Sequence, residues 1–189
     1  ILTWINELYW REFYYHIMWN FPKVSKNRAF QEKTEKIQWL DNEVDFEAWK
    51  NGATGVPIVD AFMRQLKETG WMHNRGRMIT AMFLTKNLLI DWRKGEAWFM
   101  QNLIDGDFAA NNGGWQWSAS TGTDAVPYFR VFNPITQAER FDPDGDFIRQ
   151  WCPELSHLDS KQIHKVQKNA IVDLKSSRIR AIEAFKNLS

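Results

Sequence analysis

Apolar and polar positions recur at helical spacing along most of the chain. In residues 1–20, apolar side chains recur near the helical period and share one helix face, as at Leu2, Ile5, Leu8, Tyr9, Phe13 and Ile17. The same reasoning predicts helical segments at residues 45–49, 58–66, 74–92, 96–104, 147–151 and 171–188. Strand-like alternation never extends beyond a few residues, and no repeat of fixed period occurs. The pattern therefore predicts an all-α fold.

Polar and glycine-containing stretches predict the breaks between these helices. Residues 21–36 are polar and contain a proline, so we expect a loop with room for one short helix. Gly95 is expected to interrupt the chain before the next helix. Residues 111–114 predict a flexible break, and residues 133–145 predict a series of turns.

The predicted helix over residues 74–92 carries polar side chains on one stripe. Arg77 and Met78 follow Asn74 by three and four residues, and therefore lie beside it on the surface of the helix. We expect Lys86 on the outer, solvated side of this helix. The stripe is a candidate wall of a binding site.

The composition is that of an ordinary globular protein, except for its tryptophans. Hydrophobic residues make up 44% and charged residues 25% of the 189 positions, which fits one domain. The 11 Trp residues predict either a very aromatic core or an aromatic-lined site. The formal net charge of +1 does not indicate a nucleic-acid partner, which would need a local basic patch.

Cysteine content and the apolar runs bear on the compartment. The single cysteine, Cys152, excludes an internal disulfide, and we expect it to be a buried small side chain in a cytoplasmic protein. No apolar run approaches the ~18 residues of a membrane span, so no membrane partner is expected. The chain begins at Ile1 in mid-pattern, without a leader segment, which predicts an excised fragment. We also expect a monomer.

Several common chemistries lack their residue patterns. Asp142, Asp144 and Asp146 imitate the start of a calcium loop, but glycine stands at the fourth place and proline replaces the bidentate glutamate. The four His residues are scattered without ligand spacing, so no metal site is expected. Neither a glycine-rich phosphate loop nor a nucleophile elbow occurs, and hydrolase chemistry is not predicted.

Three longer motifs resemble the DNA photolyase/cryptochrome family. They are residues 7–14 (ELYWREFY), residues 70–75 (GWMHNR) and residues 105–124, which contain DGD, NNGGWQW and SASTGTD. The similarity runs with little interruption from Leu2 to about Glu154 and again from Ile171. Within the family, the motifs are similar to those of bacterial class I cyclobutane pyrimidine dimer photolyases.

The resemblance implies an all-helical domain that binds FAD non-covalently in a bent conformation, beside a hole of the size of a pyrimidine dimer. In that family, light excites the fully reduced flavin, which passes an electron to a dimer flipped out of DNA, and the cyclobutane ring opens. Flipping is needed because a stacked dimer cannot reach a buried flavin. The implied partners are therefore FAD and DNA that contains pyrimidine dimers.

The resemblance also implies roles for residues on the flavin side. Asn111 matches the asparagine that faces flavin N5, where a carboxamide can serve either protonation state of that nitrogen. Arg77 and Asp105 match an ion pair against the isoalloxazine ring. The remaining implied contacts are Gly106 and Asp107 beside the flavin, and Trp4 and Asn74 near its adenine and ribose.

On the lesion side, Glu7 matches a carboxylate that hydrogen-bonds the base edge of the dimer. Trp10 and Trp117 match aromatic walls for the flipped bases. Met78 matches the methionine of dimer photolyases, and with Glu7 and Asn111 it completes the implied catalytic set. The implied contacts to the rim or the lesion strand are Arg11, Tyr14, Asn74, Arg75, Arg130 and Gln137.

Trp115, Trp92 and Trp39 match a chain of tryptophans that carries electrons from the surface to the flavin. From the residues alone, all three are interpreted as core side chains.

Compared with the family, residues 1–189 correspond to the C-terminal part of the FAD-binding domain. The N-terminal α/β antenna domain and the Ser/Thr-rich segment that grips the FAD phosphates have no counterpart here, so the antenna pigment cannot be predicted. The stretch 165–170 is shorter than in the family. Two alternatives remain: a cryptochrome-type photosensor without repair activity, and a truncated helical DNA-binding module that has lost flavin.

Overall fold

The structure is a computed structural model that describes residues 2–186 and 188, with side chains from residue 4 onward. The helices are α1 (Leu2–Asn20), α2 (Glu43–Lys50), α3 (Pro57–Thr69), α4 (Asn74–Met82), α5 (Trp92–Asn102), α6 (Phe108–Ala119), α7 (Pro134–Phe141), α8 (Asp146–Trp151) and α9 (Leu174–Lys186). Shorter turns are η1 (Val24–Lys26), η2 (Glu32–Lys36), the π-helical η3 (Phe83–Asn87) and η4 (Pro153–Leu155). Helices and turns are the regular structure of the described residues, which confirms the all-α prediction.

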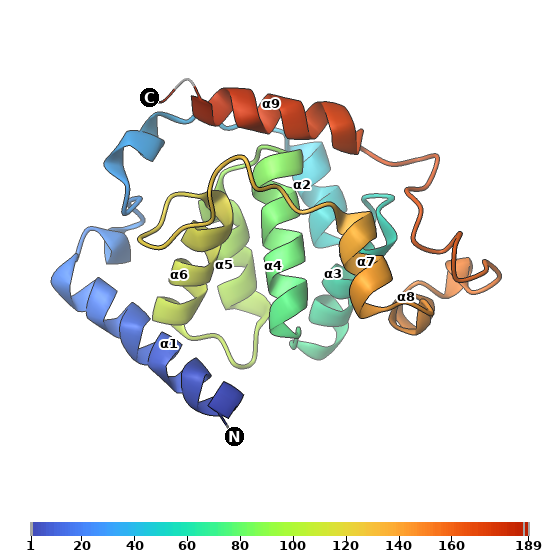
Figure 1. Cartoon of the computed structure of the whole chain (residues 1–189), viewed down its shortest axis with the longest axis horizontal. Helices are drawn as coiled ribbons and strands as arrows, with labels where there is room; N and C mark the ends of the chain where they lie inside the picture. Colours follow the sequence, from blue (N-terminus) through green and yellow to red (C-terminus); the bar gives the residue numbers. More distant parts are fainter. Residues whose placement is uncertain (1, 187, 189) are drawn as a thin grey trace.

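Helices α4, α5 and α6 form the centre of the molecule, and the other elements surround them (Figure 1). Helix α1 packs on α6 at one side, while α3, α7 and α8 lie on the other side and α9 crosses the top (Figure 1). The largest fully buried side chains include Trp49, Trp92 and Trp115. The tryptophan-rich composition therefore builds the core as well as the site.

Helix α6 corrects the prediction of a flexible break at residues 111–114, because it is continuous through them. The Asp107 side chain caps its start by accepting a hydrogen bond from Ala110 N. Gly113 is required by packing, since a Cβ there would lie 2.1 Å from the Tyr14 ring. Burial against α1 thus outweighs the weak helix propensity of the two glycines.

The predicted helix over residues 74–92 is too long. Helix α4 passes into η3, and the chain turns at Leu89, which has a φ of 54°. Helix α5 then starts at Trp92, with the Asp91 carboxylate as its cap. Gly95 therefore lies inside α5 instead of ending a segment, and a Cβ there would meet the Trp115 ring at 2.1 Å.

Helix α7 lies where only turns were predicted. Asn133 caps it by accepting a hydrogen bond from Ile135 N, and Pro134 occupies its first turn. This start signal is readable from the sequence, but Asn-Pro also favours a turn, so the pattern alone does not distinguish the two. The helices predicted at residues 45–49, 58–66, 147–151 and 171–188 are confirmed as α2, α3, α8 and α9, with bounds that differ by a few residues.

Lys86 is another correction, because it is 0% exposed and not solvated. Its Nζ donates to Ser120 Oγ at 2.8 Å and to the Ala119 carbonyl at 3.3 Å, and lies 3.5 Å from the centre of the Phe185 ring. Burial holds the pKa of Lys86 well below its ordinary value. The change from α-helix to π-helix in η3 alters which side chains face the core, and this change is not encoded in a simple period.

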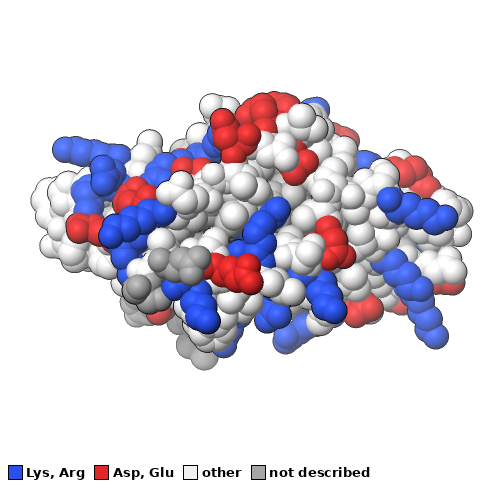
Figure 2. All heavy atoms as spheres, turned by 90° about the horizontal axis from the view of Figure 1, so that it is seen from above, with Lys and Arg blue, Asp and Glu red and all other residues white. Residues whose placement is uncertain are grey.

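The surface mixes charges of both signs. On the face that carries α9, Lys and Arg side chains are interspersed with Asp and Glu (Figure 2). Among the described residues, no helix is long and apolar enough to cross a membrane, and no group of three acidic, His or Cys side chains is placed to hold a metal ion. Cys152 is buried as expected, and burial raises the pKa of its thiol to about 12.

Candidate functional site

A large cavity opens between α1, α4, α5 and α6. Its volume is about 540 Å³, within the usual range for sites that bind small molecules. The predicted site residues that line it are Glu7, Trp10, Arg11, Tyr14, Asn74, Arg77, Met78, Asp105, Gly106, Asp107, Asn111, Trp115 and Trp117. Residues from distant parts of the sequence are thus brought around one space.

An ion pair forms one side of this cavity. Arg77 Nη2 donates to both carboxylate oxygens of Asp105, at 2.9 and 2.8 Å. Arg77 Nε also donates to the Met72 carbonyl at 2.8 Å, which fixes the guanidinium on α4. The pair is half-exposed to the cavity, so a planar polar ligand could contact it without breaking it.

Asn111 is oriented by a buried carboxylate that the sequence did not single out. Asn111 Nδ2 donates to the Glu96 carbonyl at 3.0 Å and to Glu96 Oε1 at 3.2 Å. Among the described residues, no hydrogen bond engages the side-chain oxygen of Asn111, and Asn111 lines the cavity. Burial raises the pKa of the Glu96 carboxyl, although the Asn111 hydrogen bond opposes this. A carboxylate on the apolar face of α5, three residues before Phe99, is the sequence signal that could have revealed Glu96.

Asp107 connects α1 to the start of α6. It caps α6, and its Oδ2 accepts a hydrogen bond of 2.5 Å from the Tyr15 hydroxyl. This hydrogen bond is the main reason that the pKa of Tyr15 is raised. The contact holds the wall formed by α1 against the wall formed by α6.

Aromatic side chains face the cavity from α1. The rings of Trp10 and Tyr14 stack with centroids 6.1 Å apart, and Trp10 remains 46% exposed. Burial is the main reason that the pKa of Tyr14 is raised, with smaller contributions from the charges of Asp124 and Glu7. An aromatic surface beside a carboxylate is suited to a flat ligand with hydrogen-bonding edges.

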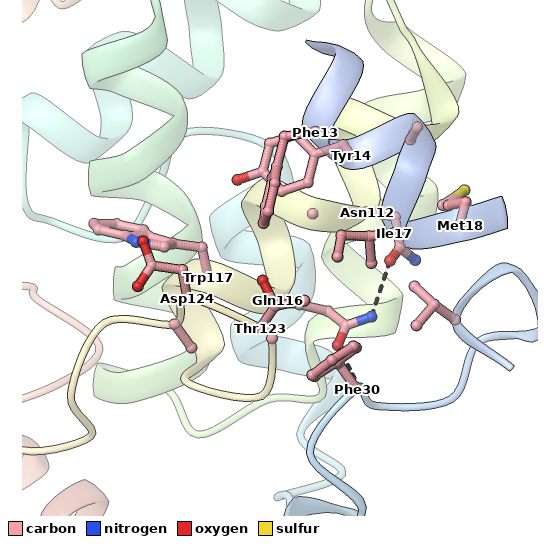
Figure 3. A pocket seen from close by; sticks show the side chains of 15 residues that line it. Phe13, Tyr14, Ile17, Met18, Phe30, Asn112, Gln116, Trp117, Thr123 and Asp124 are labelled. Carbon is pink, nitrogen blue, oxygen red and sulfur yellow. Dashed lines mark hydrogen bonds between the residues drawn. The ribbon is translucent and has the colours of Figure 1, made fainter. Parts of the chain in front are cut away.

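A smaller pocket of about 20 Å³ lies between α1, α6 and the segment that follows α6 (Figure 3). Side chains from α1 and α6 face one another there, and Gln116 bridges to Asn112 and to Phe30 N at 2.9 Å each (Figure 3). Tyr14 and Trp117 line both this pocket and the large cavity. The side chains packed around the small pocket therefore support one wall of the large cavity.

The large cavity fits a fused heteroaromatic ring system such as that of a flavin. Gly114 lines it, and a Cβ built on Gly114 would meet no atom within 4 Å. The absence of a side chain at Gly114 therefore leaves room in the cavity that a ligand could occupy. Met72, Phe99 and Leu103, which were not predicted, add an apolar floor. The apolar floor suits the face of such a ring, and the polar groups at one side suit its hydrogen-bonding edge.

The other predicted site residues do not line the cavity. Trp4 is 66% exposed, Arg130 is exposed, and Arg75 and Gln137 are partly buried. Trp39 and Trp92 also lie outside the cavity lining.

The three predicted electron-transfer tryptophans occupy different environments. Trp115 and Trp92 are buried, and the Trp115 ring reaches Gly95, one turn after Trp92 on α5. Trp39 is partly buried and packs edge-on against Phe185, with centroids 6.2 Å apart. Their role as an electron-transfer chain stays a prediction.

Comparison with known proteins extends this picture of a helical domain with a polar and aromatic ligand cavity. Residues 4–187 match the family described as the FAD binding domain of DNA photolyase. The deoxyribodipyrimidine photo-lyase of Escherichia coli K12 is 55% identical over an alignment that covers 97% of this chain and 42% of that protein.

Two solved structures agree with this assignment. A class III photolyase from Agrobacterium tumefaciens superposes with a TM-score of 0.93 and 45% identity, over 98% of this chain and 42% of that one. A cryptochrome from Synechocystis has a TM-score of 0.90 and 35% identity, over 96% of this chain and 41% of that one. The chain therefore belongs to the FAD-binding domain family of DNA photolyase, and it spans about two fifths of the length of these relatives.

Proposed function

We propose that the chain is the C-terminal part of a photolyase FAD-binding domain and serves the light-driven repair of cyclobutane pyrimidine dimers in DNA. The observation that carries the proposal is the cavity of about 540 Å³, because it joins a flavin-type polar side and an aromatic lesion-type side in one space. When bound, reduced FAD supplies the light-excited electron that opens the cyclobutane ring. The residues of the chain would bind and orient the flavin and the lesion, and would exclude water from the space between them.

On the flavin side, Arg77 and Asp105 would lie against the ring system, with Gly106 and Asp107 close to its edge. Asn111 presents its carbonyl oxygen because Glu96 engages its amide nitrogen. An acceptor fixed in this way suits a ligand N–H and disfavours rotation of the carboxamide. Preorganisation of this kind lowers the reorganisation needed when the charge of the ligand changes.

On the lesion side, Trp10 and Trp117 would pack against flipped bases, and Glu7 would accept hydrogen bonds from their edges. Met78 lies on α4 among the residues that line the same cavity. Base stacking on aromatic side chains contributes about 1–3 kcal/mol per base. Trp115, Trp92 and Trp39 are proposed to carry electrons towards the flavin.

The chain would need help to hold the FAD diphosphate. The described residues around the cavity offer two guanidinium groups, and each already has a carboxylate partner: Arg11 lies 3.7 Å from Glu12, and Arg77 pairs with Asp105. We propose that the diphosphate is gripped by parts of the longer protein that correspond to the unmatched length of the relatives. The antenna pigment belongs to the same unmatched part.

A photosensor of the cryptochrome type is the second candidate, because a cryptochrome shares this fold with 35% identity. The set of Glu7, Trp10 and Met78 in the cavity favours repair, since a sensor needs no surface for a lesion. A DNA-binding module without flavin is the third candidate, and the need for an external phosphate grip is what favours it.

One illumination experiment separates the three. The chain is mixed with reduced FAD and an oligonucleotide that contains a thymine dimer, and the return of thymine absorbance is followed under blue light and in the dark. Light-dependent return supports repair. Photoreduction of bound flavin without repair points to a sensor, and DNA binding without any flavin binding points to the third candidate.

A further inference from the structure

Three aromatic rings from distant parts of the chain are stacked at the end of α9. Phe185 of α9 lies edge-on to Trp39, with ring centres 6.2 Å apart, and parallel to Tyr128, again with ring centres 6.2 Å apart. Phe185 is buried, Trp39 is partly buried and Tyr128 is 36% exposed. The stack therefore leads from Trp39, the outermost tryptophan of the proposed electron chain, through a buried ring to a phenol at the surface.

The bridging ring is held in place by buried polar contacts. Lys86 Nζ lies 3.5 Å from the centre of the Phe185 ring. Earlier in α9, the helix is fastened to η3, because Asn87 Nδ2 donates to Ser177 Oγ at 2.9 Å and Arg180 Nη2 donates to the Asn87 carbonyl at 2.6 Å. These contacts fix α9 against η3, so the Phe185 ring keeps a defined position between its two aromatic neighbours.

Tyr128 is separated from the other tyrosines of the chain. The three others, Tyr9, Tyr14 and Tyr15, all lie on α1. Tyrosine and tryptophan are the side chains from which a strong one-electron oxidant removes an electron most readily, whereas a phenyl ring resists oxidation. The Phe185 ring therefore acts as a spacer that couples two oxidisable rings, and the exposed position of Tyr128 lets water take the proton of its hydroxyl group.

We propose that Tyr128 is the terminal electron donor of the tryptophan chain and refills an oxidised Trp39 across the Phe185 ring. One electron moves from the phenol to the Trp39 radical cation, which becomes neutral tryptophan again. The hydroxyl proton of Tyr128 passes to water, and a neutral tyrosyl radical remains at the surface. The oxidant that takes the electron from Trp39, through the other tryptophans, is the light-excited flavin of the proposed function, and the inference rests on that function for this starting point.

Loss of the phenolic proton makes the transfer hard to reverse. A radical cation on Trp39 can take back the electron that it has just given up. A neutral tyrosyl radical needs a proton as well as an electron, and its proton has already left for the solvent. Tyr128 would therefore prolong the separation between the missing electron and the site that received it.

Pulse radiolysis tests this relay without flavin, DNA or light. Azide radicals oxidise tryptophan in preference to tyrosine, and the decay of the tryptophan radical absorption is followed together with the rise of the tyrosyl radical band. The measurement is made in a variant that combines Tyr9→Phe, Tyr14→Phe and Tyr15→Phe, in which Tyr128 is the remaining tyrosine. We expect the tyrosyl radical to form at the expense of tryptophan radicals, at a rate that does not depend on protein concentration.

Substitutions along the stack identify the route. In the same background, Tyr128→Phe should abolish the tyrosyl signal, and Trp39→Phe should abolish its concentration-independent rise. Phe185→Leu should slow the rise, because the smaller aliphatic side chain leaves a gap between the two outer rings. Trp19→Phe is the matched control, because Trp19 is 84% exposed on α1 and outside the stack, and it should leave the rate unchanged.

Melting curves establish that each variant is folded. A comparison of Tyr128→Phe with the wild-type chain gives a second form of the test that needs no change on α1, and part of the tyrosyl signal should be lost there. Loss of no part of the signal in this comparison would contradict the relay.

A rate that Trp39→Phe leaves unchanged would overturn the relay, because the Tyr128 radical would then arise without Trp39. Absence of a tyrosyl radical in the folded background variant would also overturn it, and so would a rate proportional to protein concentration, which indicates transfer between molecules. Flavin binding and light-dependent repair are measured separately, so that a failure of the relay is distinguished from a failure of the proposed function.

Discussion

At the scale of single residues, the motifs predicted which side chains surround the cavity but not how they are held. Arg77 and Asp105 form the expected ion pair. The role of Glu96 was missed, because its contact with Asn111 depends on how α5 and α6 pack. The predicted exposure of Lys86 was wrong because a π-helical turn shifts the helix face. Contacts between helices are fixed by packing geometry, which spacing along one helix does not contain.

Glu96→Gln should change how stability depends on pH. Burial raises the pKa of Glu96 above its ordinary value of 4.5. As pH rises above 4.5, the unfolded chain therefore releases the Glu96 proton while the folded chain still holds it. The Glu96 contribution to stability therefore falls with rising pH, and glutamine removes it while keeping an acceptor for Asn111. Urea unfolding should show the variant gaining stability relative to the wild type as pH rises above 4.5. A constant difference over this range would contradict the assignment.

Lys86→Met should show the opposite pH trend. Burial lowers the pKa of Lys86 well below its ordinary value of 10.5, so the wild type gains stability as pH rises towards that value. The methionine variant lacks this gain and should lose ground to the wild type as pH rises above neutrality. Lys175→Met on the exposed side of α9 is the control and should show no such trend in urea unfolding.

Trp10→Ala should weaken binding to dimer-containing DNA by roughly 1–3 kcal/mol, the contribution of one aromatic–base stack. The flavin absorption spectrum should stay unchanged, since Trp10 belongs to the lesion side. Trp19→Ala is the matched control, because Trp19 is 84% exposed on α1 and does not line the cavity. A changed flavin spectrum with unchanged DNA affinity would show that Trp10 is misplaced.

At the scale of elements, strong periodicity predicted helices well, and glycine and asparagine misled the prediction. Helix α6 contains both residue types and is nevertheless continuous, because Gly113 lets Tyr14 of α1 pack closely against it. Helix α7 was missed although its Asn-Pro start is present. Local helix propensity therefore gives an initial prediction of each helix, and tertiary contacts determine whether the helix forms.

Gly113 and Gly114 allow a direct comparison on α6. Gly113→Ala should lower the melting temperature, because its Cβ would lie 2.1 Å from the Tyr14 ring and push α1 away. Gly114→Ala should raise it, since alanine favours a helix interior by about 0.5–1 kcal/mol over glycine and no atom lies within 4 Å of the new Cβ. Thermal unfolding of the two variants measures this, and equal shifts would refute the packing described for α1 and α6.

At the scale of the whole molecule, the family and the all-α fold were predictable because long motifs occur in order along the chain. The net charge of +1 carried no information about DNA, since Lys and Arg are interspersed with Asp and Glu on the face seen in Figure 2. The chain covers 42% of the E. coli relative, and we propose that the phosphate grip corresponds to the length of that relative that the chain does not cover. The cavity is the part of the site that the chain itself provides.

Flavin binding to that cavity is the most direct measurement. Fluorescence titration with FAD, and with lumiflavin, which has the ring system but no phosphates, compares the wild type with Gly114→Leu. The wild type should bind the ring system, and the leucine side chain, which would project into the space at Gly114, should abolish binding without lowering the melting temperature. Equal binding of both ligands by the two proteins, or no binding of either ligand by the wild type, would contradict the assignment of this cavity to the flavin.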